Sequence, residues 1–182
     1  LYEYIECYAP KLFQEIQALV KAGKWHIMGG WYLQPDCTVP SGEAFLRQIS
    51  VGREFFDEKF SAHPTTAVNF DSFGHTRGLV QILKKSGYDS YLFCRPMKEF
   101  LSLPANPFLW RGYDGSEIKA LRLDDANLYC SALGNDRNEI VRKAGAFAQQ
   151  DVGVALWGVG NHGGGPSRKD LSDIMELMDE KK

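Results

Sequence analysis

The stretch from Thr66 to Lys85 constrains the fold more than any other part of the sequence. Thr66-Ala67-Val68 is short and β-branched, as in a buried strand, and the apolar residues after Gly78 recur at helical spacing. Asp71 therefore stands where a strand gives way to a helix, and Gly74 lets the chain turn. In parallel α/β folds, active-site groups gather at this edge of the sheet. Asp71 is thus a candidate nucleophile or metal ligand, with capping of the next helix as the alternative.

Helix and strand signals alternate along the whole chain. The predicted helices begin at Pro10, after Ser41 and after Asp71, and further helices cover residues 137–150 and 167–178. The predicted strands are 25–28, 66–68, 90–94, a hairpin around the Asp114-Gly115 turn, and 153–157. This alternation predicts one α/β domain over residues 1–182, with a mostly parallel sheet that is open or partly closed as a barrel.

The charge and the apolar pattern exclude two classes of partner. A formal net charge of −2 gives no general attraction to phosphate backbones or anionic membranes, so we expect no nucleic-acid partner. No apolar run approaches the roughly 20 residues of a membrane span, so we expect no membrane partner. The sequence allows a homo-oligomer without requiring one.

The four cysteines are scattered and form no Cys-x-x-Cys pair: Cys7, Cys37, Cys94 and Cys130. This spacing predicts free thiols in a reducing compartment, hence a cytoplasmic protein, and argues against a structural zinc knot. The first residue is not Met, and we expect the chain to be an excised piece of a longer protein.

Polar side chains follow several of the predicted strands. Trp31 and then Asp36 follow the first, Asp71 the second, Arg95 the third, and His162 lies in a glycine-rich loop after the last. If the strands are parallel, these groups share one rim, and together they have the composition of a hydrolytic sugar or metal site. A guanidinium at Arg95 would favour the charged form of a nearby carboxylate and fix its orientation.

Each of these residues also has a structural interpretation. His162 is otherwise an exposed loop histidine, and Arg95 is otherwise one member of a surface ion pair. Trp31 and Phe73 are either core aromatics or rings that stack on a sugar. His75 is the weaker histidine candidate, since a hydrogen bond near the following helix explains it equally well.

Four motifs together resemble the α-mannosidases of glycoside hydrolase family 38, most closely the bacterial branch that is similar to the cytosolic eukaryotic enzymes. They occur in the family's order over nearly the whole chain: Gly29-Gly30-Trp31-Tyr32-Leu33-Gln34-Pro35-Asp36, Pro40-Ser41-Gly42-Glu43, Asn69-Phe70-Asp71-Ser72-Phe73-Gly74-His75-Thr76 and Gly160-Asn161-His162-Gly163-Gly164-Gly165-Pro166.

The resemblance implies a fold, an activity and a set of roles. The fold would be part of a seven-stranded, mostly parallel β/α barrel related to polysaccharide deacetylases. The activity would be retaining hydrolysis of terminal α-linked mannose in an oligosaccharide substrate. Asp71 would be both the nucleophile and a zinc ligand, and His162 would also bind zinc. Phe73 and Arg95 would line the mannose site, where we also place Trp31 and Asp36 as substrate-binding residues.

The general acid is the role least easily placed. Asp125 is the predicted donor, with Asp124 and then Asp114 as competitors, and all three have a structural alternative as turn or cap residues. The donor must stay protonated, so its surroundings should raise its pKa. The attacking carboxylate should lie about 5–5.5 Å from it.

One departure from the family's pattern matters. The family supplies two further zinc ligands from a His-x-Asp segment on its first barrel strand, and no His-x-Asp occurs in these 182 residues. The large C-terminal β domains of the family are also absent from this sequence. A catalytic zinc ion takes roughly three protein ligands. We therefore expect these residues, alone, to bind zinc weakly and to hydrolyse little.

Two other functions stay open at this point. A metal-dependent polysaccharide deacetylase would use a similar strand-end aspartate and histidine, with a metal-activated water. A non-catalytic carbohydrate-binding fragment would use Trp31, Phe73 and Trp110 as stacking platforms. A barrel section with no site of its own is the wholly structural alternative.

Overall fold

The computed structural model describes residues 1–72, 74–123, 132–146, 154–159 and 165–180. The chain divides into two compact units, Leu1–Arg122 and Leu123–Lys182. None of the helices in the described part of the chain is both long and apolar enough to cross a membrane.

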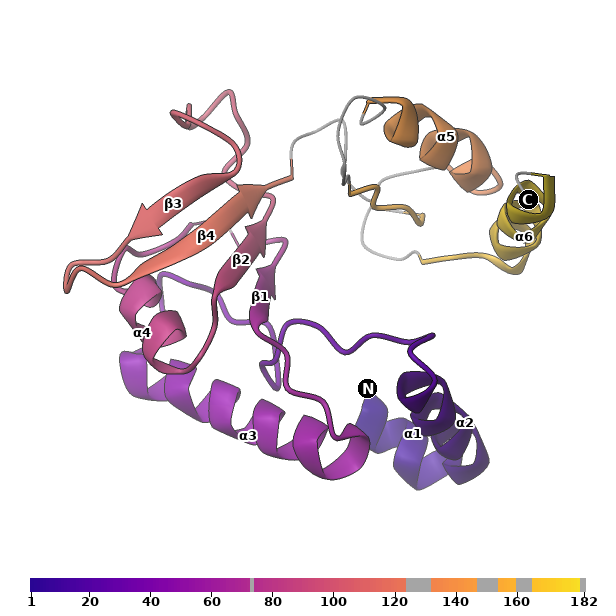
Figure 1. The fold of residues 1–182 in the computed structure, drawn as a ribbon, viewed down its shortest axis with the longest axis horizontal. Helices are drawn as coiled ribbons and strands as arrows, with labels where there is room; N and C mark the ends of the chain where they lie inside the picture. The colour runs from indigo at the N-terminus through magenta and orange to yellow at the C-terminus, as the bar shows by residue number, and fades with distance from the viewer. Residues whose placement is uncertain (73, 124–131, 147–153, 160–164, 181–182) are drawn as a thin grey trace. The chain divides into compact units, whose positions relative to one another are not determined.

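The first unit is built on a sheet with the strand order β1-β2-β4-β3 (Figure 1). Its strands are β1 (Thr66–Asn69), β2 (Ser90–Phe93), β3 (Phe108–Arg111) and β4 (Glu117–Arg122). β1, β2 and β4 are parallel, and β3 pairs with β4 in the antiparallel direction. This confirms the predicted α/β class with a mostly parallel sheet, and also the predicted hairpin.

Four helices belong to the same unit: α1 (Tyr2–Tyr8), α2 (Pro10–Lys21), α3 (Gly42–Phe60) and α4 (Leu79–Lys85). α2 begins at Pro10, as predicted, because proline suits the first turn of a helix. α3 is capped by Ser41, whose Oγ accepts a hydrogen bond from the Ala44 amide at 3.3 Å. Helix α1 was not predicted from the sequence.

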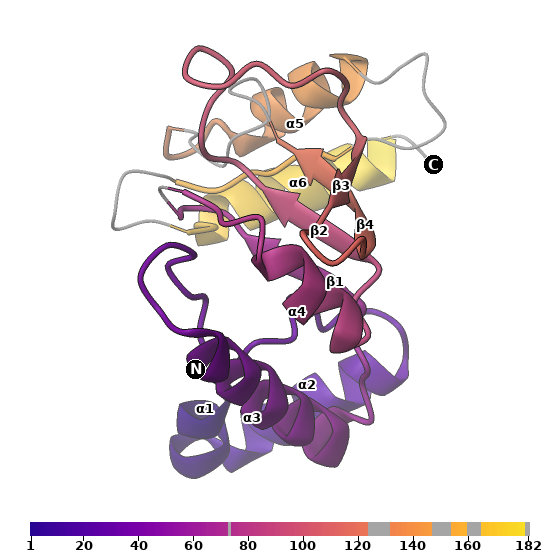
Figure 2. The same ribbon diagram turned by 90° about the vertical axis from the view of Figure 1, so that its left-hand side faces the viewer.

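The core lies between the sheet and helices α3 and α4. α4 lies between α3 and the sheet in both views (Figure 1; Figure 2). Alternate residues of β1 and β2 are buried, since successive side chains of a strand point to opposite faces. The fully buried face is made of Phe45 and Ile49 from α3, Leu79, Val80 and Leu83 from α4, and Ala67, Tyr91, Ile118 and Ala120 from the strands.

Helix α3 approaches the backbone of the Gly30–Tyr32 segment closely at Gly52. A Cβ atom at this glycine would lie 2.5 Å from the Tyr32 amide nitrogen and 2.6 Å from the Gly30 carbonyl oxygen. The two backbones can approach this closely only because glycine has no side chain. This contact positions the segment that carries Trp31 against the helix.

The strand predicted at residues 25–28 is wrong. Residues 25–28 belong to no strand, although Gly29 directly after them donates a backbone hydrogen bond to the Thr66 carbonyl of β1 at 3.1 Å. Trp25 and Met28 are 41% and 55% exposed, so much of this apolar segment is in contact with solvent.

The second unit contains α5 (Asp136–Ala146) and α6 (Arg168–Glu180), which pack against each other. Both helices were predicted. Two buried carboxylates organise the unit: Asp170 Oδ1 accepts from the Asp136 amide at 3.3 Å, and Asp136 Oδ1 accepts from the Gly158 amide at 3.2 Å. The strand predicted at 153–157 is wrong for the described residues 154–157, which belong to no strand.

Candidate active site

Asp71 and Arg95 lie at the carboxyl ends of two neighbouring parallel strands. β1 and β2 pair with Asn69 opposite Phe93, so each of the two charged residues comes two positions after a paired residue. Arg95 Nε donates a hydrogen bond to Asp71 Oδ1 at 2.5 Å. The two side chains remain 35% and 41% exposed, so the carboxylate is oriented by the guanidinium and still open to a ligand.

Buried polar contacts hold the loop that carries Asp71. Ser72 Oγ donates to the Gly74 carbonyl at 2.8 Å and accepts from the Cys37 amide at 3.2 Å. Asn69 Nδ2 donates to the Pro35 carbonyl at 2.8 Å. The loop after β1 is therefore tied to the segment 35–37, which is distant in the sequence.

Asp36 closes a local turn. Its Oδ1 accepts hydrogen bonds from the Thr38 amide and the Thr38 hydroxyl, both at 2.8 Å, and these bonds lower the pKa of the carboxyl. The structure thus joins Asp36 to Thr38, and the contacts that it describes do not include one between Asp36 and Asp71.

Trp31 is a core residue. It is 7% exposed, its Nε1 donates to the Val68 carbonyl at 2.8 Å, and its ring packs against Phe45 and Tyr88. Of the two interpretations open for this residue, the described packing agrees with a core aromatic.

Phe73, Asp124, Asp125 and His162 lie outside the described residues. On either side of the segment that contains His162, the Val159 amide donates a hydrogen bond to the Gly165 carbonyl at 3.3 Å.

Asp114 is poorly suited to donate a proton. Its carboxylate pairs with Lys85 at 2.8 Å and accepts from the Ser116 amide and hydroxyl in the hairpin turn. The hydrogen bond from Lys85, followed by that from the Ser116 amide, lowers the pKa of Asp114 to about 2. A general acid needs a raised pKa, whereas the pKa of Asp114 is lowered.

His75 makes more hydrogen bonds and ring contacts than the sequence indicated. Its Nε2 lies 2.5 Å from the Arg95 carbonyl oxygen, and its Nδ1 lies 2.9 Å from the Tyr91 hydroxyl. The ring makes edge contacts with Tyr91 and Phe93, at centroid distances of 5.6 and 5.0 Å. Burial lowers the pKa of His75. Its position directly after the Asp71 loop was the one sequence signal available.

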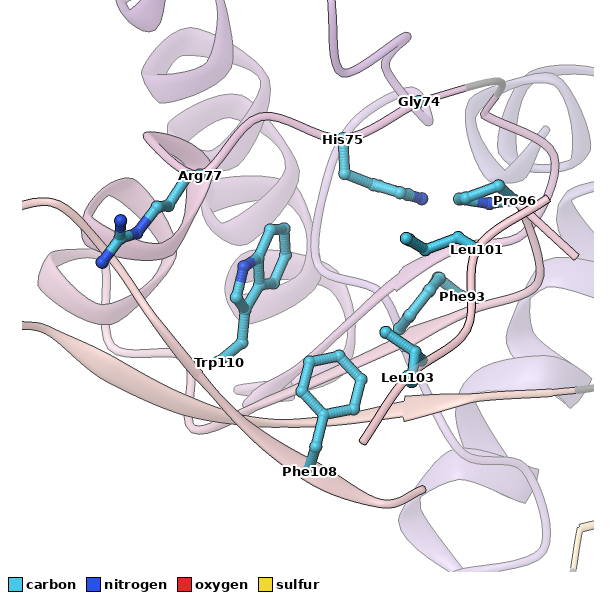
Figure 3. Close-up of a pocket in the computed structure, with 9 residues that line it drawn as sticks. All are labelled: Gly74, His75, Arg77, Phe93, Pro96, Leu101, Leu103, Phe108 and Trp110. Atoms are coloured by element: carbon cyan, nitrogen blue, oxygen red, sulfur yellow. The ribbon is translucent and has the colours of Figure 1, made fainter. Parts of the chain in front are cut away.

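An apolar pocket of about 430 Å³ lies beside His75 (Figure 3). Its walls include Phe93, Leu103, Phe108 and Trp110, and neither Asp71 nor Arg95 lines it. In Figure 3 the His75 side chain points toward Pro96, and Arg77 points away from the apolar residues. Trp110, a platform in the carbohydrate-binding alternative, therefore faces a cavity distinct from the charged pair.

The described residues by themselves do not form a zinc site. No group of three or more His, Cys, Asp or Glu side chains in this part of the chain is arranged to hold a metal ion. Asp71 contributes one carboxylate, and a catalytic zinc ion takes roughly three protein ligands.

Known structures share this fold. The chain superposes on an α-mannosidase from Enterococcus faecalis V583 with a TM-score of 0.70 and 20% identity, covering 97% of this chain and 20% of that one. A putative polysaccharide deacetylase from Mycobacterium smegmatis matches with a TM-score of 0.60 and 16% identity, covering 95% of this chain and 62% of that one. Both neighbours have barrel-like α/β folds.

Residues 1–181 match the model of the glycosyl hydrolases family 38 N-terminal domain, and the chain belongs to this family. Among relatives by sequence, α-mannosidase G of Dictyostelium discoideum is 29% identical over 182 residues. The match covers 98% of this chain but 16% of the relative, so the chain spans about one sixth of that protein's length.

Proposed function

We propose that this chain is part of the catalytic domain of a retaining α-mannosidase that releases terminal α-linked mannose from oligosaccharides. The contact between Arg95 and Asp71 in a family 38 chain is the observation that carries the proposal. It supports Asp71 as the nucleophile, because the carboxylate is oriented and also partly exposed.

In the proposed reaction, Asp71 attacks the anomeric carbon while the glycosidic bond breaks and an acid protonates the leaving oxygen. Water then hydrolyses the glycosyl-enzyme, and two displacements give retention. We propose Asp125 as the acid. Arg122 at the end of β4 pairs with Phe93 of β2. In the sequence, Asp124 and Asp125 are two and three residues after Arg122.

We further propose that Asp71 and His162 both bind one zinc ion, together with ligands from outside these 182 residues. A bound zinc ion would hold sugar hydroxyls and stabilise developing charge. Zinc titration of the chain, compared with an Asp71→Ala variant, tests this by metal binding alone. We expect weak binding that the substitution weakens further, and equal binding by both proteins would contradict it.

We propose Phe73 and Arg95 as residues of the mannose site. We also propose a cytoplasmic protein, in line with the free thiols of Cys7 and Cys37.

Trapping with a fluorinated mannosyl substrate tests the reaction. The experiment uses the longest natural polypeptide that contains this chain, with the 182-residue chain in parallel. We expect a covalent label on Asp71, no label in Asp71→Asn, and full labelling in Asp57→Asn, a control at an exposed carboxylate in α3. Acetate release from an acetylated polysaccharide without labelling would favour the deacetylase. Sugar binding that Asp71→Asn leaves intact, without hydrolysis, would favour the binding fragment.

A further inference from the structure

We propose that His75, as the neutral tautomer protonated on Nε2, is a positioning residue that holds Arg95 against Asp71. The proposal rests on the proposed function, in which Asp71 is the nucleophile. His75 does not touch Asp71 in the described structure and acts through the backbone of Arg95.

The two ends of a hydrogen-bond chain determine the tautomer. The Arg95 carbonyl oxygen can only accept, so the Nε2 atom that lies 2.5 Å away must carry the proton. A neutral imidazole then leaves Nδ1 as an acceptor, and the Tyr91 hydroxyl at 2.9 Å donates to it.

Further buried polar contacts lie behind Tyr91. The Cys37 thiol lies 3.7 Å from the Tyr91 oxygen, and Asn69 Nδ2 lies 2.9 Å from Cys37 Sγ. The Asn69 amide orientation is fixed, since the same Nδ2 donates to the Pro35 carbonyl, which can only accept. Asn69 therefore donates to the Cys37 sulfur, and Tyr91 donates through His75 to the Arg95 carbonyl; the Cys37 thiol contacts the Tyr91 oxygen and also lies 3.9 Å from the Pro35 carbonyl.

This chain begins and ends beside the charged pair. Asn69 is two residues before Asp71 at the end of β1, and the last acceptor is the backbone of Arg95 itself. The Asp71 and Arg95 side chains are both more than one third exposed, and an exposed ion pair alone orients its members weakly. The buried chain holds the backbone of Arg95 in place behind the exposed pair.

The packing of the ring agrees with a neutral imidazole. Tyr91, Phe93 and Trp110 surround His75 edge-on, at centroid distances of 5.6, 5.0 and 6.3 Å. This aromatic environment lowers the pKa of His75 through burial, which favours the uncharged form that the chain of hydrogen bonds requires.

A double-mutant cycle tests the positioning role in the longest natural polypeptide. His75→Phe keeps a ring but removes both hydrogen bonds, and we expect kcat/KM for an aryl α-mannoside to fall about 10- to 100-fold. His75→Gln, which keeps a donor, should recover part of the loss. In an Arg95→Ala background, His75→Phe should cost less than about threefold, because its effect passes through Arg95. Equal losses in both backgrounds would overturn the proposal.

A second measurement does not depend on activity. Nitrogen-15 NMR of the 182-residue chain identifies which imidazole nitrogen carries the proton. At neutral pH we expect the proton on Nε2 and none on Nδ1. In Tyr91→Phe, which removes the hydroxyl donor, the nitrogen-15 chemical shift of Nδ1 should move to that of an acceptor without a hydrogen bond. An Nδ1–H tautomer or a doubly protonated ring at neutral pH would refute the positioning chain even if the enzyme proves to be a mannosidase. The Nε2–H tautomer in a protein without mannosidase activity would refute the proposed function alone.

Discussion

Arg95 Nε donates to Asp71 Oδ1 at 2.5 Å, across the ends of the parallel strands β1 and β2. Neither residue is near the other in sequence, and each is carried by the first loop after its strand. The carboxylate is thus presented at one edge of the sheet with a fixed cation beside it, which is the geometry that the proposed nucleophile needs.

Arg95→Ala should impair catalysis strongly. Its guanidinium orients the proposed nucleophile, so we expect kcat to fall about 10- to 100-fold for an aryl α-mannoside. Arg47→Ala is the matched control, since Arg47 forms an exposed ion pair with Glu43 inside α3. Steady-state kinetics on both variants would refute the role of Arg95 if they showed equal rates.

Gly52→Ala should destabilise the first unit. Its new Cβ would lie 2.5–2.6 Å from three backbone atoms of the Gly30–Tyr32 segment, and backbone cannot move aside as a flexible side chain could. Overpacking of this kind costs roughly 1–3 kcal/mol. Urea unfolding of the variant measures the loss.

Gly145→Ala is the control for that experiment. Gly145 lies in α5 with open space around its missing Cβ, so alanine should stabilise the chain by about 0.5–1 kcal/mol. Similar effects at Gly52 and Gly145 would contradict the close approach of α3 to the Trp31 segment.

Trp31→Phe distinguishes a core residue from a sugar platform. The substitution removes the hydrogen bond to the Val68 carbonyl and part of the ring volume, and we expect the free energy of unfolding to fall by about 1–3 kcal/mol. KM for a mannoside should stay unchanged. A raised KM with unchanged stability would instead support Trp31 as a substrate-binding residue.

The folded state should lose stability in acid partly through His75. Burial lowers the pKa of this histidine from its usual 6.5, so the unfolded chain takes up a proton first as the pH falls. The free energy of unfolding of the wild type, relative to His75→Phe, should therefore decrease as the pH falls through about 6.5, and level off below the folded-state pKa. Urea titrations between about pH 8 and pH 5 test this. A flat difference would show that the ring titrates alike in both states.

Local signals in the sequence predicted most of the elements. Pro10 and Ser41 are signals for helix starts that can be recognised from a few neighbouring residues, and the structure has a helix start at each. The juxtaposition of Asp71 and Arg95 was predictable for a different reason, since the ends of parallel strands meet at one edge of a sheet whatever the sequence between them.

The remaining features depend on contacts that the sequence does not encode locally. Residues 25–28 have the composition of a strand, but strand formation requires a partner along their whole length. Trp31 is equally apolar in a core and in a sugar site, and the burial that decides between them comes from Phe45 and Tyr88. The contacts of His75 could not be predicted from the sequence, because one partner is the backbone carbonyl at position 95, which any residue there would supply.

The alignment of β1 with β2 has a consequence for protein engineering. Because Asn69 is opposite Phe93, Asp71 and Arg95 face each other at equal offsets. Lengthening the connection between the two strands would leave that match intact, whereas a single deletion between Phe93 and Arg95 would shift the guanidinium by one step and turn it to the opposite side of the chain. Insertions are thus best confined to the helical crossover, and the two short strand exits should be kept at their present length.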